Sequence, residues 1–246
     1  MRVGRKFKRF SRLFEALIRL ERWLQSIRFR LRGDREKVFV IGLNKTGTTS
    51  MAHILREAGL LVADQREFEI LTARWLSGHM TRRSFERKLR KKIRCYQAFQ
   101  DIPFSLPDLT PFLWERYPEA KFILTKRSSG EEWASSLEGM FLRWSENQAG
   151  VHSWDVLEEA HYRTKGFPAL LLTRLGGRRE RPISFKEFAH IHDDYLEFVT
   201  LLSSFIGRRS LLVVDLKEVD ALERIESFIC RSSGLSVVPH LNPRAS

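Results

Sequence analysis

The architecture of this chain follows from the segment Lys37-Val38-Phe39-Val40-Ile41-Gly42-Leu43-Asn44-Lys45-Thr46-Gly47-Thr48-Thr49-Ser50. Its apolar run predicts a buried strand, and the turn rich in glycine and threonine predicts a loop that opens a helix. Backbone N–H groups of such a loop, together with the N-terminus of the helix, favour a phosphate group. The segment therefore predicts a nucleotide site between a strand and a helix.

The position of the lysine separates this loop from the common ATP- and GTP-binding loop. In that loop a lysine follows the second glycine directly. Here Thr48 follows Gly47, and Lys45 stands two residues before that glycine. The cation therefore approaches the terminal group of the nucleotide from another point, which argues against an ATP or GTP hydrolase.

A second segment supplies a further candidate for anion binding. The apolar run 121–125 predicts another strand, which ends in Lys126-Arg127 before a turn and a helix that starts near Glu131. A guanidinium such as that of Arg127 binds phosphate in a fork, and Ser135, on the second turn of the following helix, can donate to the same oxygens.

These residues carry a resemblance to the sulfotransferase family, in particular to its bacterial members. The loop K-T-G-T-T, the spacing of eight between Arg127 and Ser135, and the phrase at 114–127 all resemble that family, over roughly residues 37–243. The resemblance implies 3′-phosphoadenosine 5′-phosphosulfate (PAPS) as donor, no metal, and an acceptor with a hydroxyl or amine. It implies that the 3′-phosphate is bound by Arg127 and Ser135, and the phosphosulfate by Lys45, Thr46, Gly47, Thr48 and Thr49.

Asp101 is the candidate catalytic base. The predicted strand 96–100 delivers it to the carboxyl edge of the sheet, where open α/β folds bind ligands. In cytosolic sulfotransferases, which resemble this chain, the residue at the corresponding strand end is a catalytic histidine. The heparan-type branch uses a glutamate as base. Asp101 would take a proton from the acceptor, with Lys45 stabilising charge on the leaving oxygen. The alternative is that Asp101 caps the next turn or pairs with an arginine.

The order of predicted elements indicates an α/β fold. Strands near residues 38, 98, 122 and 212 are each followed by a helix, which predicts a three-layer, P-loop-like fold with a mostly parallel sheet and helices on both faces. The run 60–63 is a further candidate strand, and 107–117 a candidate helix. We expect one domain over 37–246, preceded by a basic amphipathic helical extension over 1–36.

The charge of the chain predicts an anionic partner. Its formal net charge is +13, and its sequence pI is about 10.2. The extension 1–36 is either a helix on an anionic membrane or a cap on the domain. The basic run 82–94 is either a solvated face or a lining of the path of an acidic acceptor. Nucleic acid is the less expected partner.

Other features give weaker expectations. Cys95 and Cys230 lack metal-ligand spacing and are expected to be reduced thiols. No signal peptide or stretch of transmembrane length is present, so we expect a cytoplasmic protein, peripheral at most at the inner face of a membrane. His152 and His161 are candidate acceptor contacts. Arg244 is a candidate for the charge that a basic C-terminal loop supplies to the 3′-phosphate in cytosolic relatives.

Two rival functions stay open from the sequence. A nucleotide kinase or ATPase would use Asp215, at the end of a predicted strand, to hold magnesium, but it would also need a lysine after Gly47. A non-catalytic module that binds nucleotides or polyanions would rely on the basic extension. The acceptor of a sulfotransferase could be a glycan, a lipid or a small molecule, and the sequence does not select among them.

Overall fold

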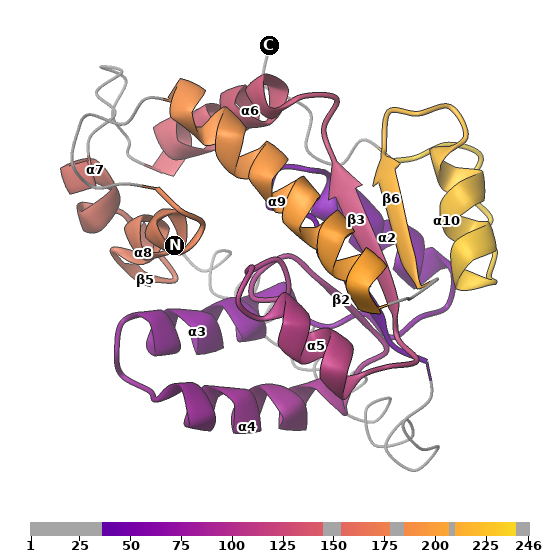
Figure 1. The fold of residues 1–246 in the computed structure, drawn as a ribbon, viewed down its shortest axis with the longest axis horizontal. Coiled ribbons are helices and arrows are strands. Elements are labelled where there is room, and N and C mark those ends of the chain that lie inside the picture. Colours follow the sequence, from indigo (N-terminus) through magenta and orange to yellow (C-terminus); the bar gives the residue numbers. More distant parts are fainter. Residues whose placement is uncertain (1–35, 145–153, 178–184, 207–209, 240–246) are drawn as a thin grey trace, which may run out of the picture.

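The computed structural model describes residues 36–144, 154–177, 185–206 and 210–239, and its centre is a sheet of four parallel strands (Figure 1). The strands lie in the order β2-β1-β3-β6. Their bounds are β1 Val38–Val40, β2 Ala98–Gln100, β3 Lys121–Lys126 and β6 Leu211–Asp215. The α/β fold with a parallel central sheet and helices on both faces, predicted from the sequence, is confirmed.

Helices connect these strands, as parallel pairing requires. They are α2 Thr48–Glu57, α3 Gln65–Leu76, α4 Arg82–Ile93, α5 Thr110–Arg116, α6 Gly130–Trp144, α7 Trp154–Glu159, α8 Phe167–Arg174, α9 Phe185–Ile206 and α10 Ala221–Ile229. A small antiparallel hairpin, β4 His161–Tyr162 with β5 Thr164–Lys165, lies between α7 and α8.

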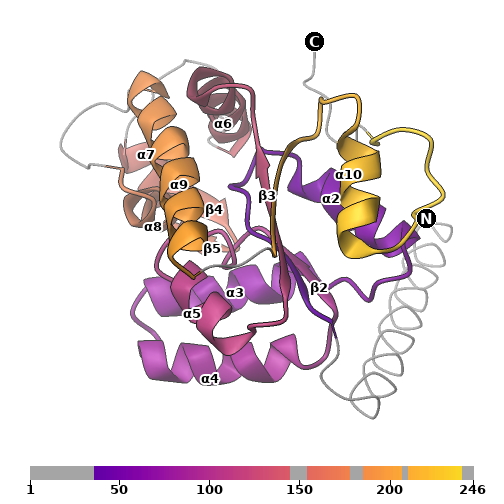
Figure 2. The same cartoon turned by 45° about the vertical axis from the view of Figure 1, so that its right-hand side comes forward.

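Alternation along β1 divides the core into two layers. Val38 and Val40 pack with α2 and α10 on one face of the sheet, whereas Phe39 and Ile41 join the larger cluster on the other face. Helices α3, α4, α5, α6, α8 and α9 all contribute to this larger cluster. Figure 2 shows α2 and α10 on one side of the strands and α9 and α6 on the other. Because successive side chains of a strand point to opposite faces, helices cover both faces of the sheet, and the fold has three layers.

The two edges of the sheet have different roles. All four strands are parallel, so their carboxyl ends meet at one edge, where the loops after β1, β2, β3 and β6 gather. At the amino edge, the buried ammonium of Lys37 donates to the backbone oxygens of Ile93 and Tyr96, at 3.2 and 2.7 Å. This lysine ties the start of β1 to the carboxyl end of α4.

Some predicted elements differ from the structure. The candidate strand 60–63 makes only an isolated bridge, Val62 with Ala98, and the helix expected over 107–117 begins at Thr110. Cys95 and Cys230 are thiols that take part in no disulfide within the described residues. None of the helices within the described ranges is both long and apolar enough to cross a bilayer. Predictions for the extension before Glu36, His152 and Arg244 fall outside the described residues.

Candidate active site

The loop between β1 and α2 has a backbone that few side chains would allow. A Cβ atom on Gly42 would lie 2.5 Å from the backbone oxygen of Thr125, so only glycine fits there. Lys45 has φ +71° and Gly47 has φ +94°, both in the left-handed region. A non-glycine residue in that region is uncommon and is typical of functional loops. The hydroxyl of Thr46 fixes the turn, 2.6 Å from both the Leu43 oxygen and the Thr125 hydroxyl.

The loop ends at the N-terminus of α2. Gly47 is the N-cap residue, no side chain caps the helix, and its first turn holds no acidic residue. The first N–H groups of a helix have no partner within the helix, and the helix dipole adds positive potential there. The loop and this helix end together form an environment that suits an anion.

Asp101 lies directly after β2 and faces this loop. Its Oδ2 accepts a hydrogen bond of 3.1 Å from the Thr48 hydroxyl, and its Oδ1 accepts one from the N–H of Ile102. Burial of the carboxyl and the nearby charge of Glu69 raise the pKa of Asp101 to about 7, although the two hydrogen bonds and the charge of Lys45 oppose the shift. A carboxylate with a pKa near neutrality can exchange protons with a ligand at neutral pH.

A second carboxylate, Glu69 on α3, supports the high pKa of Asp101. Its side chain is buried, with 4% of its surface exposed. Its Oε1 accepts a hydrogen bond of 2.8 Å from the Tyr162 hydroxyl, and its Oε2 pairs with the guanidinium of Arg163. Arg163 has φ +68°, and its guanidinium stacks on the Tyr162 ring. The β4–β5 hairpin is therefore anchored beside Asp101 through Glu69.

Arg127, directly after β3, also contacts the loop between β1 and α2. Its Nε donates to the backbone oxygen of Lys45 at 2.8 Å, and its Nη1 lies 3.3 Å from Oε1 of Glu132. Because a guanidinium has five N–H donors in a planar fork, these two contacts leave further donor capacity. The same side chain can thus hold the loop in shape and bind an anion.

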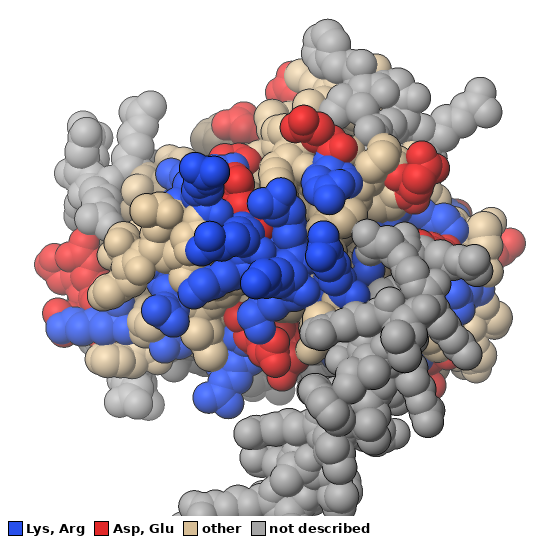
Figure 3. Space-filling model, turned by 90° about the horizontal axis from the view of Figure 1, so that it is seen from below, with Lys and Arg blue, Asp and Glu red and all other residues tan. Residues whose placement is uncertain are grey.

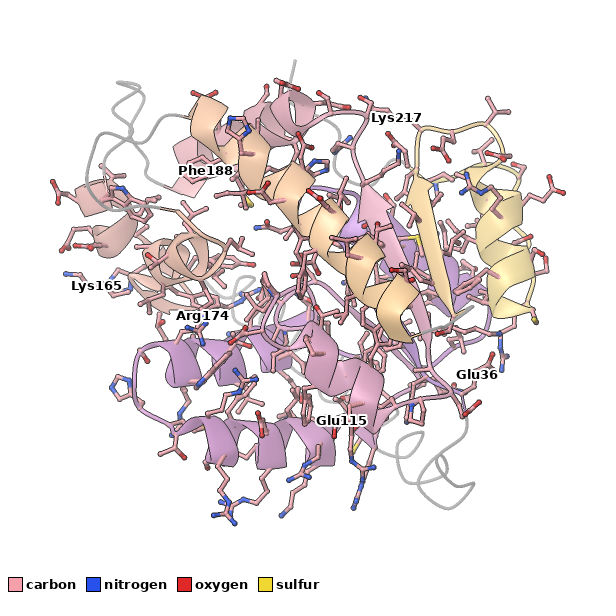
Figure 4. The ribbon with its side chains drawn as sticks, viewed as in Figure 1. Glu36, Glu115, Lys165, Arg174, Phe188 and Lys217 are labelled. Atoms are coloured by element: carbon pink, nitrogen blue, oxygen red, sulfur yellow. The ribbon has the colours of Figure 1, made fainter. Side chains whose placement is uncertain are left out.

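Glu132 also collects a second cation. Lys217, in the loop after β6, forms an ion pair with its carboxylate, and the Ser128 hydroxyl donates to the same group. Burial alone would raise the pKa of Glu132, but these hydrogen bonds and the charges of Lys217 and Arg127 lower it to about 2. Arg127 and Lys217 therefore share one carboxylate beside the loop. Figure 4 shows Lys217 at the upper edge of the sheet, far from Glu36 at the lower edge.

Aromatic side chains from α6 and α9 support the same region. The indole N–H of Trp133 donates to the Asn44 oxygen at 2.8 Å, and the Trp133 ring lies against the ring of His192, with centroids 5.8 Å apart. Nε2 of His192 accepts from the N–H of Arg127, so its Nδ1 carries the hydrogen and donates to Asp193. Tyr195 donates to the Ile41 oxygen at 2.7 Å. These contacts hold the backbone on both sides of the loop.

The structure brings together most residues singled out from the sequence. Thr48 touches Asp101, Arg127 touches Lys45, and the Thr46–Gly47 turn lies between them. Thr49 and Ser135 are exposed, on α2 and α6. Within the described residues, no hydrogen bond joins Ser135 to Arg127. His161 is exposed on β4, and the described residues hold no group of three His, Cys, Asp or Glu side chains placed for a metal.

Sequence reasoning missed Glu69, Tyr162, Arg163, Glu132, Lys217 and His192. One signal was available for Glu69, since an acidic residue between the apolar residues Phe68 and Leu71 falls on the inward side of a helix. His192 occupies a similar inward position on α9, where 1% of its surface is exposed. Arg163 and Lys217 gave no signal, because they lie in turns whose partners come from distant segments.

Comparison with known proteins agrees with this geometry. A search of curated proteins found no significant match. A protein-family comparison matches residues 37–245 to the sulfotransferase domain, which covers most of the chain. The protein is accordingly a member of the sulfotransferase family and an enzyme of that class.

Proposed function

We propose that the protein transfers a sulfuryl group from PAPS to an acceptor that carries a hydroxyl or an amine. One observation carries the proposal: the loop with Lys45, the base candidate Asp101 and the pair Arg127–Lys217 all lie at the carboxyl edge of one parallel sheet. Ligands bind at this edge in open α/β folds. Sulfotransferases generally use PAPS as the donor, and the loop provides a place for an anion at the start of α2.

In the proposed reaction the acceptor oxygen or nitrogen attacks the sulfur of PAPS in line. The bond from sulfur to the bridging oxygen of the 5′-phosphate breaks, and adenosine 3′,5′-bisphosphate leaves with that electron pair. Lys45 stabilises the negative charge that grows on the bridging oxygen, while Thr46 to Thr49 hold the phosphosulfate. Asp101 accepts the acceptor's proton. Positioning and charge neutralisation supply the catalysis, as in phosphoryl transfer.

The pKa of Asp101 is suited to this role. A base with a pKa of about 7 is ionised in a large fraction of molecules at neutral pH and still binds a proton readily. Glu69 and Tyr162 lie close enough to Asp101 for electrostatic interaction, and we place the acceptor beside this group. Glycans, lipids and small molecules can all present the required hydroxyl or amine.

Lys217 is our candidate for the additional charge at the 3′-phosphate. Its ammonium and the guanidinium of Arg127 share the carboxylate of Glu132, so the two cations lie close together. About half of the Lys217 side chain is exposed, at 53%, whereas Arg127 is mostly covered at 22%. An incoming phosphate can replace Glu132 as the partner of Lys217 without disturbing the contact of Arg127 with the loop.

Calorimetry tests the donor site directly. Adenosine 3′,5′-bisphosphate and ADP are titrated into the wild type, Arg127→Lys, Arg127→Ala and Lys217→Ala, with Lys165→Ala as control. Lys165 is an exposed cation of the β5 strand. We expect tight binding of the bisphosphate and weak binding of ADP. Arg127→Ala and Lys217→Ala should each bind the bisphosphate roughly tenfold or more weakly, because one charge-assisted contact contributes about 1.5–3 kcal/mol. Lys165→Ala should bind it as the wild type does.

The conservative variant separates charge from geometry. Arg127→Lys keeps the charge but loses the fork, so it should bind more tightly than Arg127→Ala and less tightly than the wild type. Equal binding of ADP and the bisphosphate would refute the PAPS site, as would binding of neither. If Lys165→Ala and Lys217→Ala weaken binding of the bisphosphate equally, only the role of Lys217 is rejected, and the PAPS site itself is not.

A further inference from the structure

Helix α4 has a strongly basic outer face that the proposed reaction does not use. Its inner residues Phe85, Leu89 and Ile93 are fully buried. On the outer half of α4 and at its C-cap, six cations are exposed; the first four named below follow the helical spacing of one stripe, and the other two lie beside it. They are Arg83, Arg87, Arg90, Arg94, Lys88 and Lys91. We refer to these six as the α4 basic face.

The cations of this face have no acidic partner among the residues that the structure describes. The two other basic residues of α4 have acidic partners: Arg82 pairs with Asp108 and Glu86, and Lys92 pairs with Glu67. Within the described ranges, none of the six exposed cations forms an ion pair. Figure 3, which views the molecule from below, shows an almost continuous field of Lys and Arg with acidic residues at its margin.

The α4 basic face lies away from the candidate active site. Lys37, at the start of β1, donates to the backbone of Ile93 and Tyr96, which places the end of α4 at the amino edge of the sheet. The loop with Lys45 is at the carboxyl edge. Figures 1 and 2 both show α4 at the opposite end of the molecule from the start of α6. A path for an acceptor toward Asp101 therefore does not pass over this face.

We propose that the α4 basic face docks the enzyme on an anionic membrane surface and leaves the active site directed away from the bilayer. The helix spans 12 residues, or about 18 Å, and it presents its cations on a convex face rather than in a groove. A plane of anionic headgroups can reach all of them at once, whereas a single polymer strand would follow one stripe.

The chemistry of the face fits adsorption rather than insertion. The large hydrophobic side chains that are exposed in the described residues lie on other elements, so the attraction is electrostatic. Each basic residue near an anionic bilayer strengthens binding about fivefold, and salt screens the effect within a Debye length. Residues 1–35, which are rich in arginine and lysine, join the domain at Glu36, next to Lys37 and thus at the same edge of the sheet.

Flotation with vesicles tests the docking. The full chain is mixed with vesicles of phosphatidylcholine alone, or with about 30 mol % phosphatidylglycerol, at low and high salt. Two triple variants with the same net charge are compared. The first changes the α4 basic face: Arg87→Gln, Arg90→Gln, Lys91→Gln. The second changes exposed cations on α2, α3 and β5: Arg56→Gln, Arg66→Gln, Lys165→Gln.

We expect the wild type to bind only the anionic vesicles and to dissociate at high salt. The α4 variant should bind at least about tenfold more weakly, and the control variant should lose less than about threefold. Equal losses in both variants, or unchanged binding of the α4 variant, would overturn the proposal. Tighter binding to heparin or RNA than to anionic vesicles would replace the membrane with a polymer. Thermal unfolding checks that both variants are folded, and calorimetry with adenosine 3′,5′-bisphosphate shows that the donor site is unaffected.

Discussion

Two groups of residues near Asp101, which we call the loop side and the carboxylate side, are built in different ways. On the loop side, formed by Lys45, Thr46, Thr48 and Arg127, each residue follows the end of a strand within a short distance in the chain. On the carboxylate side, Glu69 meets Tyr162 and Arg163 across more than 90 residues. The loop side thus arises from local sequence, and the carboxylate side from tertiary packing. The first is suited to bind an anion, and the second adjusts the proton affinity of Asp101.

The largest effect is expected on the loop side. Lys45→Ala should lower the turnover of PAPS roughly 10²–10³-fold, because one preorganised electrostatic contact to a developing charge commonly contributes that much. Turnover is measured as release of adenosine 3′,5′-bisphosphate in the presence of phenolic, sugar and amine acceptors. Lys126→Ala, which removes a neighbouring cation at the end of β3, is the control. A loss below about tenfold in Lys45→Ala would mean that the loop side binds but does not catalyse.

Asp101→Asn should separate stability from activity. The pKa of Asp101 is about 7 in the folded protein against an ordinary value of 3.8, so the folded state holds the proton longer than the unfolded state. The wild type should therefore lose stability as pH rises from about 4 to about 7, and the variant should not. At about pH 8 the free energy of unfolding of the variant, relative to that of the wild type, should be on the order of 2–4 kcal/mol higher than the same difference at about pH 4, with turnover strongly reduced.

Urea unfolding across this pH window measures the difference in stability. The exposed Asp155→Asn is the control. If the difference between Asp101→Asn and the wild type stays constant with pH, Asp101 is not the buried titrating group described here.

The smallest effect should come from the carboxylate side. Glu69→Gln removes the negative charge that raises the pKa of Asp101, while its amide oxygen can still accept from Tyr162. The rising limb of the pH–rate profile should move to lower pH by roughly half a unit to one unit. Glu67→Gln, an exposed acidic residue on the same helix, is the matched control. A shift in the opposite direction would show that loss of Arg163 pairing outweighs loss of charge.

The fold could be predicted from the sequence because each strand of the sheet is a short apolar run with its own turn. The prediction was wrong for 60–63, which forms one isolated bridge, Val62 with Ala98, rather than a strand. There the side chain of Gln97 accepts from the N–H of Leu61, in place of a continued ladder. An apolar run indicates burial, but whether it forms a strand depends on hydrogen bonding with the backbone of an adjacent segment.

The candidate site could be predicted in part, because several of its residues directly follow strands that the sequence reveals. Lys45, Thr48 and Arg127 were found because the carboxyl edge of a parallel sheet gathers whatever follows its strands. Ser135 followed a spacing rule, and the structure leaves it exposed with Arg127 held by Glu132 instead. Lys217 also follows a strand but is a single cation without a motif. Its pairing with Glu132 arises only from the packing of β6 beside β3.

The buried ammonium of Lys37 has a consequence for chemical labelling. With 4% of its surface exposed and two carbonyl oxygens as partners, it should resist amine-directed acylation under native conditions. Lys88 and Lys91, which are exposed on α4, should react readily. The chain therefore contains its own internal standard: mass spectrometry of acylated protein can compare two reactive amines on one helix with a shielded one that is bonded to the end of that helix.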